Sequence, residues 1–364
     1  MNPVVIEFLE DVVYRRKDPL ARVLRAVLIG LSGVYKAGIW LYLLPFHLGF
    51  RQKVRIGRPA ISVGNITVGG TGKSPMVQYL CKELQRRRLK PAVLSYGYGG
   101  SLSGKFGIVS DRDAMHLTPS FAGDEPVMLA ASLPGIPVLV CKDRLITGKT
   151  AVNEMECDVL VLDDGFQVWK LHRDLDIVLV NGKNPFDNGR TLPAGKLREP
   201  LSALRRADCI VATGVWDPEA KRDMMARVLR AAGSAPVFFA RFLPAGLVSL
   251  ADSSEKAIGS ITGKKVVGLC SIANPESFEQ TLADLGVNAA VCERFPDHHA
   301  YTARDITAIN RSTDDNRAEM IITTDKDAIK LDAHQFTVPV YSLRIGIEID
   351  DEKSFWDLVM NRVG

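Results

Sequence analysis

The chain has 364 residues, a net charge of +4, an apolar fraction of 46% and a charged fraction of 24%. These are ordinary values for a globular protein of about two domains, and the small charge gives no argument for a nucleic-acid partner. The six cysteines are scattered without a Cys-x-x-Cys pair. Neither a zinc site nor a disulfide framework is therefore indicated, and reduced thiols on the cytosolic side are the simplest account.

The N-terminal region contains a mostly apolar stretch over residues 27–50, which approaches the length of a transmembrane helix. Basic residues flank it on both sides, so the positive-inside rule gives no orientation. At 100° per residue we expect a polar stripe with an apolar stripe opposite it. The polar stripe comprises Arg22, Arg25, Ser32 and Lys36, and the apolar stripe Leu24, Leu28, Leu31, Tyr35, Ile39 and Tyr42. The pattern favours a helix in the membrane interface over a span, and a helix in the protein core is the remaining alternative.

Residues 61–75 are the most informative segment, because a short apolar strand runs into a glycine-rich turn and then a helical pattern from Met76. Glycines let backbone N–H groups approach phosphate oxygens, and a helix N-terminus favours an anion. The predicted phosphate-binding residues are Thr67, Val68, Gly69, Gly70, Thr71, Gly72, Lys73 and Ser74. Thr67 replaces the first glycine of the usual pattern. The alternative is a glycine-rich turn before an ordinary helix.

The rest of the first two thirds of the chain alternates apolar strands with helices. The strands are predicted at Ala60–Val63, Pro91–Ser95, Val138–Cys141, Val159–Leu162, Ile177–Val180 and Cys209–Ala212, with helices that include Met76–Arg88 and Pro126–Ser132. Continuous apolar strands between helices indicate a parallel sheet covered on both faces. Ligands of such sheets gather at the carboxyl ends of the strands.

Three groups of polar residues accompany these elements. Asp163 and Asp164 end an apolar strand, where a carboxylate can help to hold Mg²⁺ or simply close a turn. Asp124 precedes a helical stretch, so it is either a helix N-cap or a carboxylate that accepts a proton from a substrate hydroxyl. Asp297 and His298 lie in a Phe-Pro-Asp-His-His segment that is either an acid–base pair or a solvated loop.

Eight motifs occur in one order along the chain. They are V-G-G-T-G-K-S-P, S-Y-G-Y-G, G-D-E-P, L-D-D-G-F-Q, L-P-A-G-x-L-R-E-P, N-P-x-x-F, F-P-D-H-H-x-Y and T-T-D-K-D. This set resembles the tetraacyldisaccharide 4'-kinases, the lipid A 4'-kinases of Gram-negative bacteria. The resemblance runs from the N-terminal region to about residue 346, and the ordered set is far more specific than any one motif.

The resemblance implies an α/β fold: a P-loop NTPase-like parallel sheet with helices on both faces, an N-terminal membrane-associated helix and a smaller C-terminal α/β domain. It implies transfer of the γ-phosphate of ATP, with Mg²⁺, to the 4'-hydroxyl of tetraacyldisaccharide 1-phosphate, which gives lipid IV-A in lipopolysaccharide biosynthesis. The expected partners are this lipid substrate and a membrane surface, with no nucleic acid and no obligate protein partner. The expected location is the cytoplasmic face of the inner membrane.

The resemblance also implies roles for single residues. Asp124 matches the base, His298 with Asp297 the group that tunes it, and Lys73 the phosphate-loop lysine. Ser74, Asp163, Asp164 and Glu125 match positions at or near the metal, and Arg144, Gln167, Glu199 and Tyr98 match polar positions of the cleft. Ser74 stands where many members have threonine, which preserves the hydroxyl. Tyr96 stands where arginine is usual, so any phosphate contact made by that arginine must be made otherwise.

Two other classes of function stay open from the residues alone. One is a P-loop GTPase or regulatory ATPase that switches a partner, although Thr324–Asp327 only superficially resembles a guanine motif. The other is a membrane-tethered binding module with a degenerate nucleotide site. The expected domains are an anchor region at 1–52, a P-loop core at 53–235, and linker strands with the smaller domain at 236–364.

Overall fold

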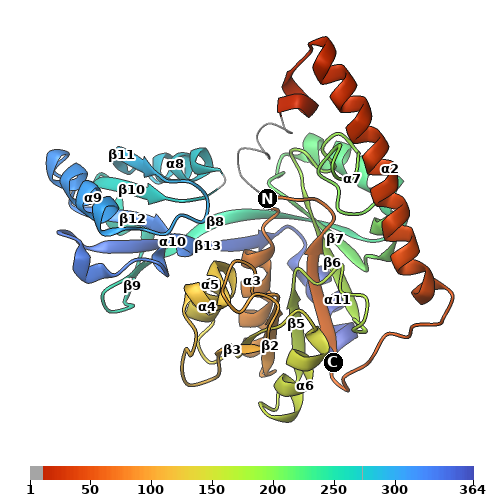
Figure 1. The fold of residues 1–364 in the computed structure, drawn as a ribbon. Coiled ribbons are helices and arrows are strands. Elements are labelled where there is room, and N and C mark those ends of the chain that lie inside the picture. The colour runs from red at the N-terminus through yellow and green to blue at the C-terminus, as the bar shows by residue number, and fades with distance from the viewer. Residues whose placement is uncertain (1–10, 273) are drawn as a thin grey trace. The chain divides into compact units, whose positions relative to one another are not determined.

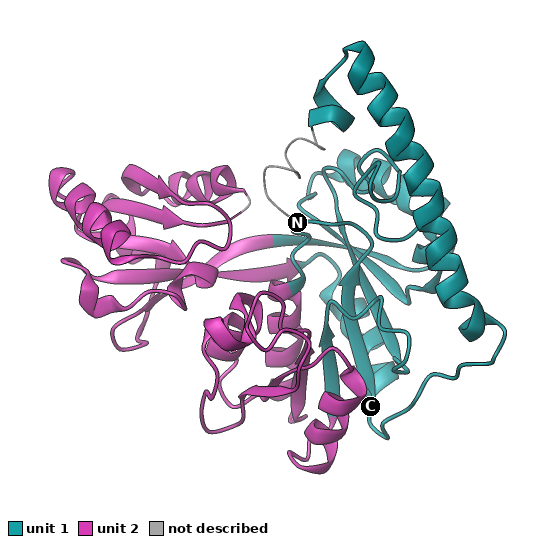
Figure 2. Ribbon diagram, in the orientation of Figure 1, with its two compact units in different colours: residues 1–73, 159–241, 349–364 teal, residues 74–158, 242–348 magenta. Residues whose placement is uncertain are grey.

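The computed structural model describes residues 11–272 and 274–364, so the first ten residues of the predicted anchor region 1–52 lie outside the described residues. The chain divides into two compact units, each assembled from segments that are far apart in the sequence (Figures 1 and 2). Unit 1 comprises residues 1–73, 159–241 and 349–364, and unit 2 comprises residues 74–158 and 242–348. The three-part division at residues 52 and 235 stays a prediction.

Unit 1 is built on parallel strands in the order β5-β1-β6-β7-β8. Their bounds are β1 Ala60–Asn65, β5 Val159–Asp163, β6 Leu175–Asn181, β7 Cys209–Thr213 and β8 Val237–Ser249, the last of which continues into unit 2. Strands β1, β5 and β7 are buried along their whole length, which explains their unbroken apolar sequences. The register pairs Val63 with Asp163, so the acidic pair begins beside the end of β1.

Helices pack on unit 1 around two successive phenylalanines of β8. Phe239 belongs to a core cluster with Met224 of helix α7 (Pro218–Ala232) and residues of the 3-10 helix η2 (Leu201–Arg206). Its neighbour Phe238 contacts Phe355 of α11 (Glu352–Val363), with ring centroids 5.3 Å apart. Since successive side chains of a strand point to opposite faces, helices cover both faces of this sheet.

Unit 2 contains two groups of elements. The first holds β2 (Pro91–Ser95) and β4 (Val138–Val140), which are parallel, and an antiparallel strand β3 (Gly107–Ser110). Its helices are α3 Lys73–Arg86, α4 Pro119–Ala122, α5 Asp124–Ser132 and α6 Arg144–Asn153. Strand β3 was not predicted, because it is only four residues long and follows an irregular loop.

The second group of unit 2 orders its strands β11-β10-β12-β13-β8, with a short antiparallel β9 beside β8. The strands are β9 Glu255–Lys256, β10 Lys265–Cys270, β11 Asn288–Arg294, β12 Met320–Thr324 and β13 Val340–Ile349. The helical segments are η3 Ile258–Ile261, α8 Pro275–Asp284, α9 Ala303–Asp315, α10 Asp325–Ala328 and η4 Ala333–Gln335. Val266 of β10 packs with α8 and Val267 with α9, so this sheet is also covered on both faces.

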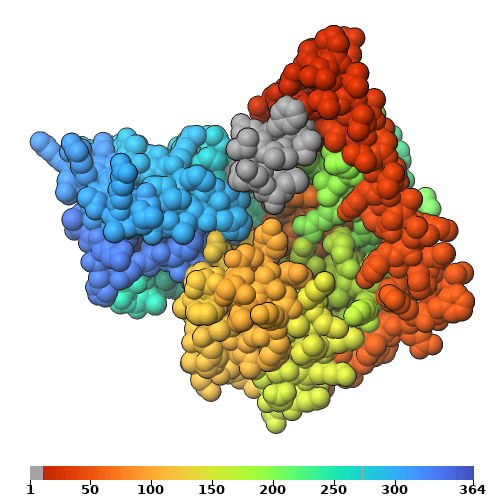
Figure 3. Space-filling model, in the orientation of Figure 1, coloured from red at the N-terminus to blue at the C-terminus, as the bar shows by residue number. Residues whose placement is uncertain are grey.

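The N-terminal helix α2 (Pro19–His47) follows the π-helical turn η1 (Asp11–Arg15) and lies on the surface of unit 1 (Figure 3). Asp18 caps it by accepting from Ala21 N at 3.0 Å. Ser32 Oγ lies 2.7 Å from Thr191 Oγ1, and Leu28 packs with Ala194. The predicted separation of polar and apolar stripes is therefore wrong for these residues, because Leu28 and Ser32 are four positions apart and share one helix face.

The opposite face of α2 is apolar and exposed. Its large exposed side chains include Leu20, Val23, Val27, Leu31, Val34 and Leu41. Among the described residues, α2 is the one helix long and apolar enough to cross a membrane, by length and composition only, and 17% of its apolar stretch is buried. That exposure disfavours the alternative of a helix in the protein core.

The predicted strands of the first two thirds are all present, and helix α3 begins three residues earlier than predicted and ends two residues earlier. The linker strands expected after residue 235 begin with β8.

One glycine of β1 is required by the close approach of another segment. A Cβ built on Gly64 would lie 2.6 Å from Phe166 Cβ and 2.8 Å from the backbone nitrogen of the same residue. We expect Gly64→Ala to lower the free energy of unfolding by about 2 kcal/mol, because backbone must move to admit the methyl group. Thermal unfolding measures this. Gly30→Ala in α2 is the control, since a Cβ there meets no atom of the described residues within 4 Å, and equal stability of both variants would contradict the prediction.

Candidate active site

The glycine-rich loop between β1 and α3 is shaped by its own polar side chains. Asn65, buried at the end of β1, donates from Nδ2 to Thr71 Oγ1 at 2.9 Å. Gly69 and Gly72 have φ values of 112° and 86°, which side chains other than glycine rarely adopt. Helix α3 begins at Lys73, so the loop leads directly into a helix N-terminus, where backbone N–H groups can bind an anion.

A second segment of unit 1 holds this loop, and sequence reasoning did not assign it that role. Val68 N donates to Lys196 O at 2.7 Å, and Arg198 N donates to Ile66 O at 2.7 Å. Both partners come from the L-P-A-G-x-L-R-E-P motif. Thr213 Oγ1 also donates to Thr71 O at 3.2 Å. The motif therefore serves as backbone support for the loop.

The acidic pair lies at the end of β5, beside β1. Lys73 Nζ is 3.5 Å from Asp164 Oδ1, and Arg198 Nη1 donates to Asp164 Oδ2 at 2.7 Å. Burial opposes the charge of Asp164, but Lys73 and Arg198 outweigh burial and hold the pKa of that carboxyl below its ordinary value. Asp163 is buried. Two carboxylates next to the phosphate loop are oxygen donors of the kind that Mg²⁺ prefers, so this part of the proposed donor set fits the ion.

No cluster of three or more His, Cys, Asp or Glu residues with the arrangement of a metal site occurs in residues 11–272 and 274–364. Ser74 begins unit 2, and Glu125 is an exposed residue in the first turn of α5. The predicted metal set of Ser74, Asp163, Asp164 and Glu125 stays a prediction.

The predicted cleft residues lie in two places. In unit 1, Gln167 Nε2 donates to Asn65 O at 3.0 Å and to Glu199 Oε1 at 2.9 Å, so both residues brace the end of β1. In unit 2, Arg144 is buried with its guanidinium 5.8 Å from the centroid of the Tyr96 ring, and Tyr98 is exposed. Tyr96 thus contacts the predicted cleft arginine.

Asp124 and His298 are brought together within unit 2, although 174 positions separate them in the sequence. His298 Nδ1 lies 3.1 Å from Asp124 Oδ2. The N-cap of α5 is Gly123, so the alternative of Asp124 as N-cap is wrong. His298 has a φ of 63°, in the left-handed region, and its neighbour Asp297 accepts from Lys326 Nζ at 2.7 Å. The Asp-His segment is therefore part of a charged cluster.

Two lysines to which the sequence assigned no role complete this cluster. Lys326 Nζ is 3.2 Å from His298 Nε2, and Lys330 Nζ is 3.9 Å from Asp124 Oδ2. Both belong to the segment that opens with the T-T-D-K-D motif. The motif could have pointed to the cluster, but the sequence alone does not show which residues its lysine and aspartates contact.

Lys330 is held by a buried carboxylate. Its Nζ lies 2.9 Å from Asp327 Oδ1 and donates to Ser271 Oγ at 2.8 Å. Asp327 is fully buried and also accepts from Thr324 Oγ1 at 2.7 Å. Burial opposes its charge, but the hydrogen bond from Ser271 and the charge of Lys330 outweigh burial and keep its pKa below the ordinary value.

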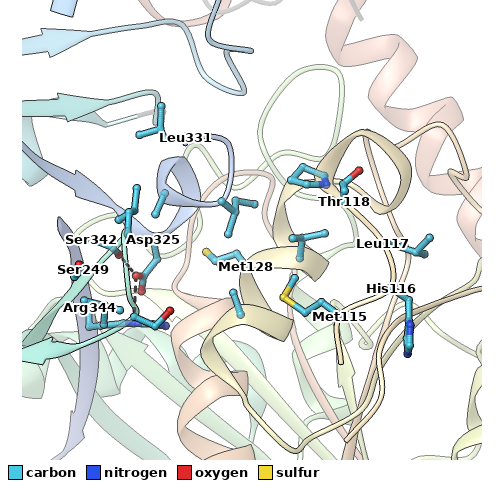
Figure 4. Close-up of a pocket in the computed structure, with 18 residues that line it drawn as sticks. Met115, His116, Leu117, Thr118, Met128, Ser249, Asp325, Leu331, Ser342 and Arg344 are labelled. Carbon is cyan, nitrogen blue, oxygen red and sulfur yellow. Dashed lines mark hydrogen bonds and ion pairs between the residues drawn. The ribbon is translucent and has the colours of Figure 1, made fainter. Parts of the chain in front are cut away.

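Unit 2 also contains a cavity of about 460 Å³ (Figure 4). Helix α5 lines it with Val127 and Met128, and α10 lines it with Asp325 and Ala328. Burial raises the pKa of Asp325, whose carboxylate faces Arg344 at 3.5 Å. The cavity therefore adjoins α5, which carries Asp124, and α10, which carries Lys326. Neither Asp124 nor His298 lines it.

A glycine loop between a buried strand and a helix, with a lysine at the helix start and acids on the neighbouring strand, defines a nucleotide-phosphate-binding protein of the P-loop class. The particular family follows from comparison with known proteins. The sequence model of the family described as Tetraacyldisaccharide-1-P 4'-kinase (LpxK) matches residues 24–364, and the chain belongs to this family of kinases.

Individual relatives agree with this assignment. The "Tetraacyldisaccharide 4'-kinase" of Syntrophus aciditrophicus is 40% identical over 95% of this chain and 94% of its own length. The protein of the same description from Geobacter sulfurreducens is 40% identical over 88% of this chain and 89% of its own. The crystal structure of "apo" form LpxK from Aquifex aeolicus in complex with ATP has a TM-score of 0.77 and 30% identity, and covers 94% of this chain and 100% of that one. The predicted fold class is confirmed.

The buried pair of Lys330 and Asp327 generates a prediction about pH. We expect Asp327→Asn to lower the free energy of unfolding by about 3 kcal/mol at neutral pH, because the largely buried side chain of Lys330 loses its nearest counter-ion. The folded pKa of Asp327 lies below its ordinary value of 3.8, so the stabilisation by the carboxylate is present above that value and is lost as pH falls through the folded pKa.

Thermal unfolding of both proteins at a series of pH values measures the difference, which should shrink as the pH falls below 4. The control is Asp332→Asn, since Asp332 is exposed. A difference between parent and Asp327→Asn that grows towards acid pH would contradict the prediction.

Proposed function

We propose that this protein transfers the γ-phosphoryl group of ATP to the 4'-hydroxyl of tetraacyldisaccharide 1-phosphate and so makes lipid IV-A. Membership of the kinase family supports the reaction. The observation that carries the assignment of residues is the pair formed by Asp124 and His298, with 3.1 Å between Oδ2 and Nδ1. Family membership also disfavours a nucleotide-dependent switch and a degenerate binding module.

In the proposed reaction the 4'-oxygen attacks the γ-phosphorus, a new P–O bond forms, and the bond to the bridging oxygen of ADP breaks. Backbone N–H groups of residues 67–74 and the Lys73 ammonium hold the phosphates and neutralise their charge. Asp124 accepts the proton of the hydroxyl. His298 hydrogen-bonds the same carboxylate and fixes its direction.

We propose that Ser74, Asp163, Asp164 and Glu125 hold Mg²⁺. When bound, the ion neutralises charge on the phosphate oxygens. In this structure Lys73 and Arg198 both pair with Asp164. These two cations keep the carboxylate ionised, which is the form that binds a metal.

The lipid substrate supports a membrane location for the protein. A molecule with four acyl chains does not leave a bilayer readily, and the exposed apolar face of α2 is suited to the bilayer interface. Because ATP is available on the cytoplasmic side, we propose that the protein works on the cytoplasmic face of the inner membrane.

The first prediction concerns Asp124. We expect Asp124→Asn to lower kcat for transfer of labelled γ-phosphate to tetraacyldisaccharide 1-phosphate in mixed micelles by about 100-fold or more, because the base is lost. The matched control is Asp111→Asn, which removes the carboxylate from another Asp–His pair, at 2.6 Å from His116. Activity that survives in Asp124→Asn, or that falls equally in both variants, would contradict the assignment. If the folded parent transferred no phosphate, the proposed function itself would be contradicted.

The second prediction concerns the exposed face of α2. We expect Val34→Asp to weaken sedimentation with vesicles containing anionic lipid by about tenfold, since an apolar side chain is replaced by a charge that the interface excludes. Val34 is 69% exposed, so folding should be unaffected. Ser234→Asp adds the same charge at an exposed position after α7 and serves as the control. Equal vesicle binding by the two variants would argue against this face as the docking surface.

A further inference from the structure

Lys326 lies between two members of the charged cluster of unit 2. Its Nζ donates to Asp297 Oδ1 at 2.7 Å and lies 3.2 Å from His298 Nε2. The other ring nitrogen of His298, Nδ1, lies 3.1 Å from Asp124 Oδ2. The side chain of Lys326 is 18% exposed, and the residue lies in the short helix α10.

The contact with Lys326 indicates which nitrogen of His298 carries the proton, because Asp297 Oδ2 lies 3.9 Å from Nε2, beyond hydrogen-bond distance, whereas the ammonium is within it. An ammonium group has three donors and no acceptor, so the nitrogen that it faces must offer a lone pair. Nε2 is therefore the unprotonated nitrogen, and the proton of the neutral ring lies on Nδ1. The Nδ1–H group then donates to Asp124, which as a carboxylate only accepts.

We propose that Lys326 is a positioning residue that holds His298 in the Nδ1–H tautomer, so that the imidazole donates a hydrogen bond to Asp124. This inference deepens the proposed function and rests on it for its link to turnover. Asp297 holds Lys326 in place by the 2.7 Å contact. Without the ammonium, Nε2 is free to carry the proton, and Nδ1 then presents a lone pair to the carboxylate, which is repulsive.

The other charged groups around Asp124 do not replace this role. Lys330 lies 3.9 Å from Asp124 Oδ2, but its contacts to Asp327, Ser271 and the carbonyl of His299 direct its ammonium elsewhere. It supplies positive charge near the carboxylate and makes no described contact with the imidazole of His298.

The experiment reads the tautomer directly. In protein labelled with ¹⁵N-histidine, the imidazole nitrogen shifts show which nitrogen is protonated, and a His298→Asn sample assigns the signal among six histidines. We expect Nδ1–H in the parent and a change towards Nε2–H in Lys326→Met. Lys326→Arg retains a donor and a charge, and we expect it to keep the parent tautomer.

Turnover is measured on the same samples. For Lys326→Met we expect kcat to fall by about 10- to 100-fold, because the base loses its oriented partner, with KM for ATP unchanged within about twofold. Lys326→Arg should recover most of kcat. Lys264→Met is the matched control, since it removes another lysine of unit 2 from an ion pair, 2.6 Å from Glu319, outside the cluster.

Three results would overturn the inference: an Nε2–H signal in the parent, a parent-like tautomer in Lys326→Met, or full turnover by that variant despite a changed tautomer. Failure of the proposed function has a different signature. In that case the parent transfers no phosphate to the lipid, while the spectra still decide whether Lys326 sets the tautomer.

Discussion

Burial of the strands is the constraint on which both charged clusters depend, since β12 is also buried over its first four residues. Strands β1 and β5 are buried at every position, so a charge can appear only where such a strand stops, and it must be paired there. Asp164, just after β5, meets Lys73 and Arg198. Asp327, just after β12, meets Lys330 and Ser271. In each unit, an aspartate that follows a buried strand pairs with a lysine. In unit 1 this lysine lies in the loop that we propose binds phosphate, and in unit 2 it lies near Asp124, the proposed base.

The two clusters differ in what holds them. In unit 1 the support is largely backbone, because the segment around Lys196 exchanges main-chain hydrogen bonds with the glycine loop. In unit 2 the support is a chain of side chains, from Thr324 and Ser271 through Asp327 to Lys330. A loop that binds phosphate through its N–H groups needs an ordered main chain, whereas a proton-accepting carboxylate needs oriented donors. The form of support matches the task that we propose for each cluster.

Helix α2 connects the nucleotide-binding unit to the proposed membrane surface. On its inward face Ser32 contacts Thr191, the residue before the motif that supports the glycine loop, and Tyr35 donates to the carbonyl of Arg198 within that motif. Its outward face is apolar and exposed. One helix therefore contacts the support of the glycine loop on one side and, under the proposed function, the lipid on the other.

The sequence by itself determined the parallel α/β class, the strands of the first two thirds, the glycine-rich loop between a strand and a helix, and the family, because these depend on local periodicity and on ordered short motifs. It linked His298 to Asp124 only through the family resemblance, and it did not determine the roles of Lys326 and Lys330 or the inward face of α2. Those depend on contacts such as that of His298 with Asp124, across 174 positions, and no local pattern encodes which distant side chains meet. Tertiary structure decided them, because ionic and hydrogen-bonded contacts are specified by three-dimensional distance, and the packing of buried strands and helices sets that distance.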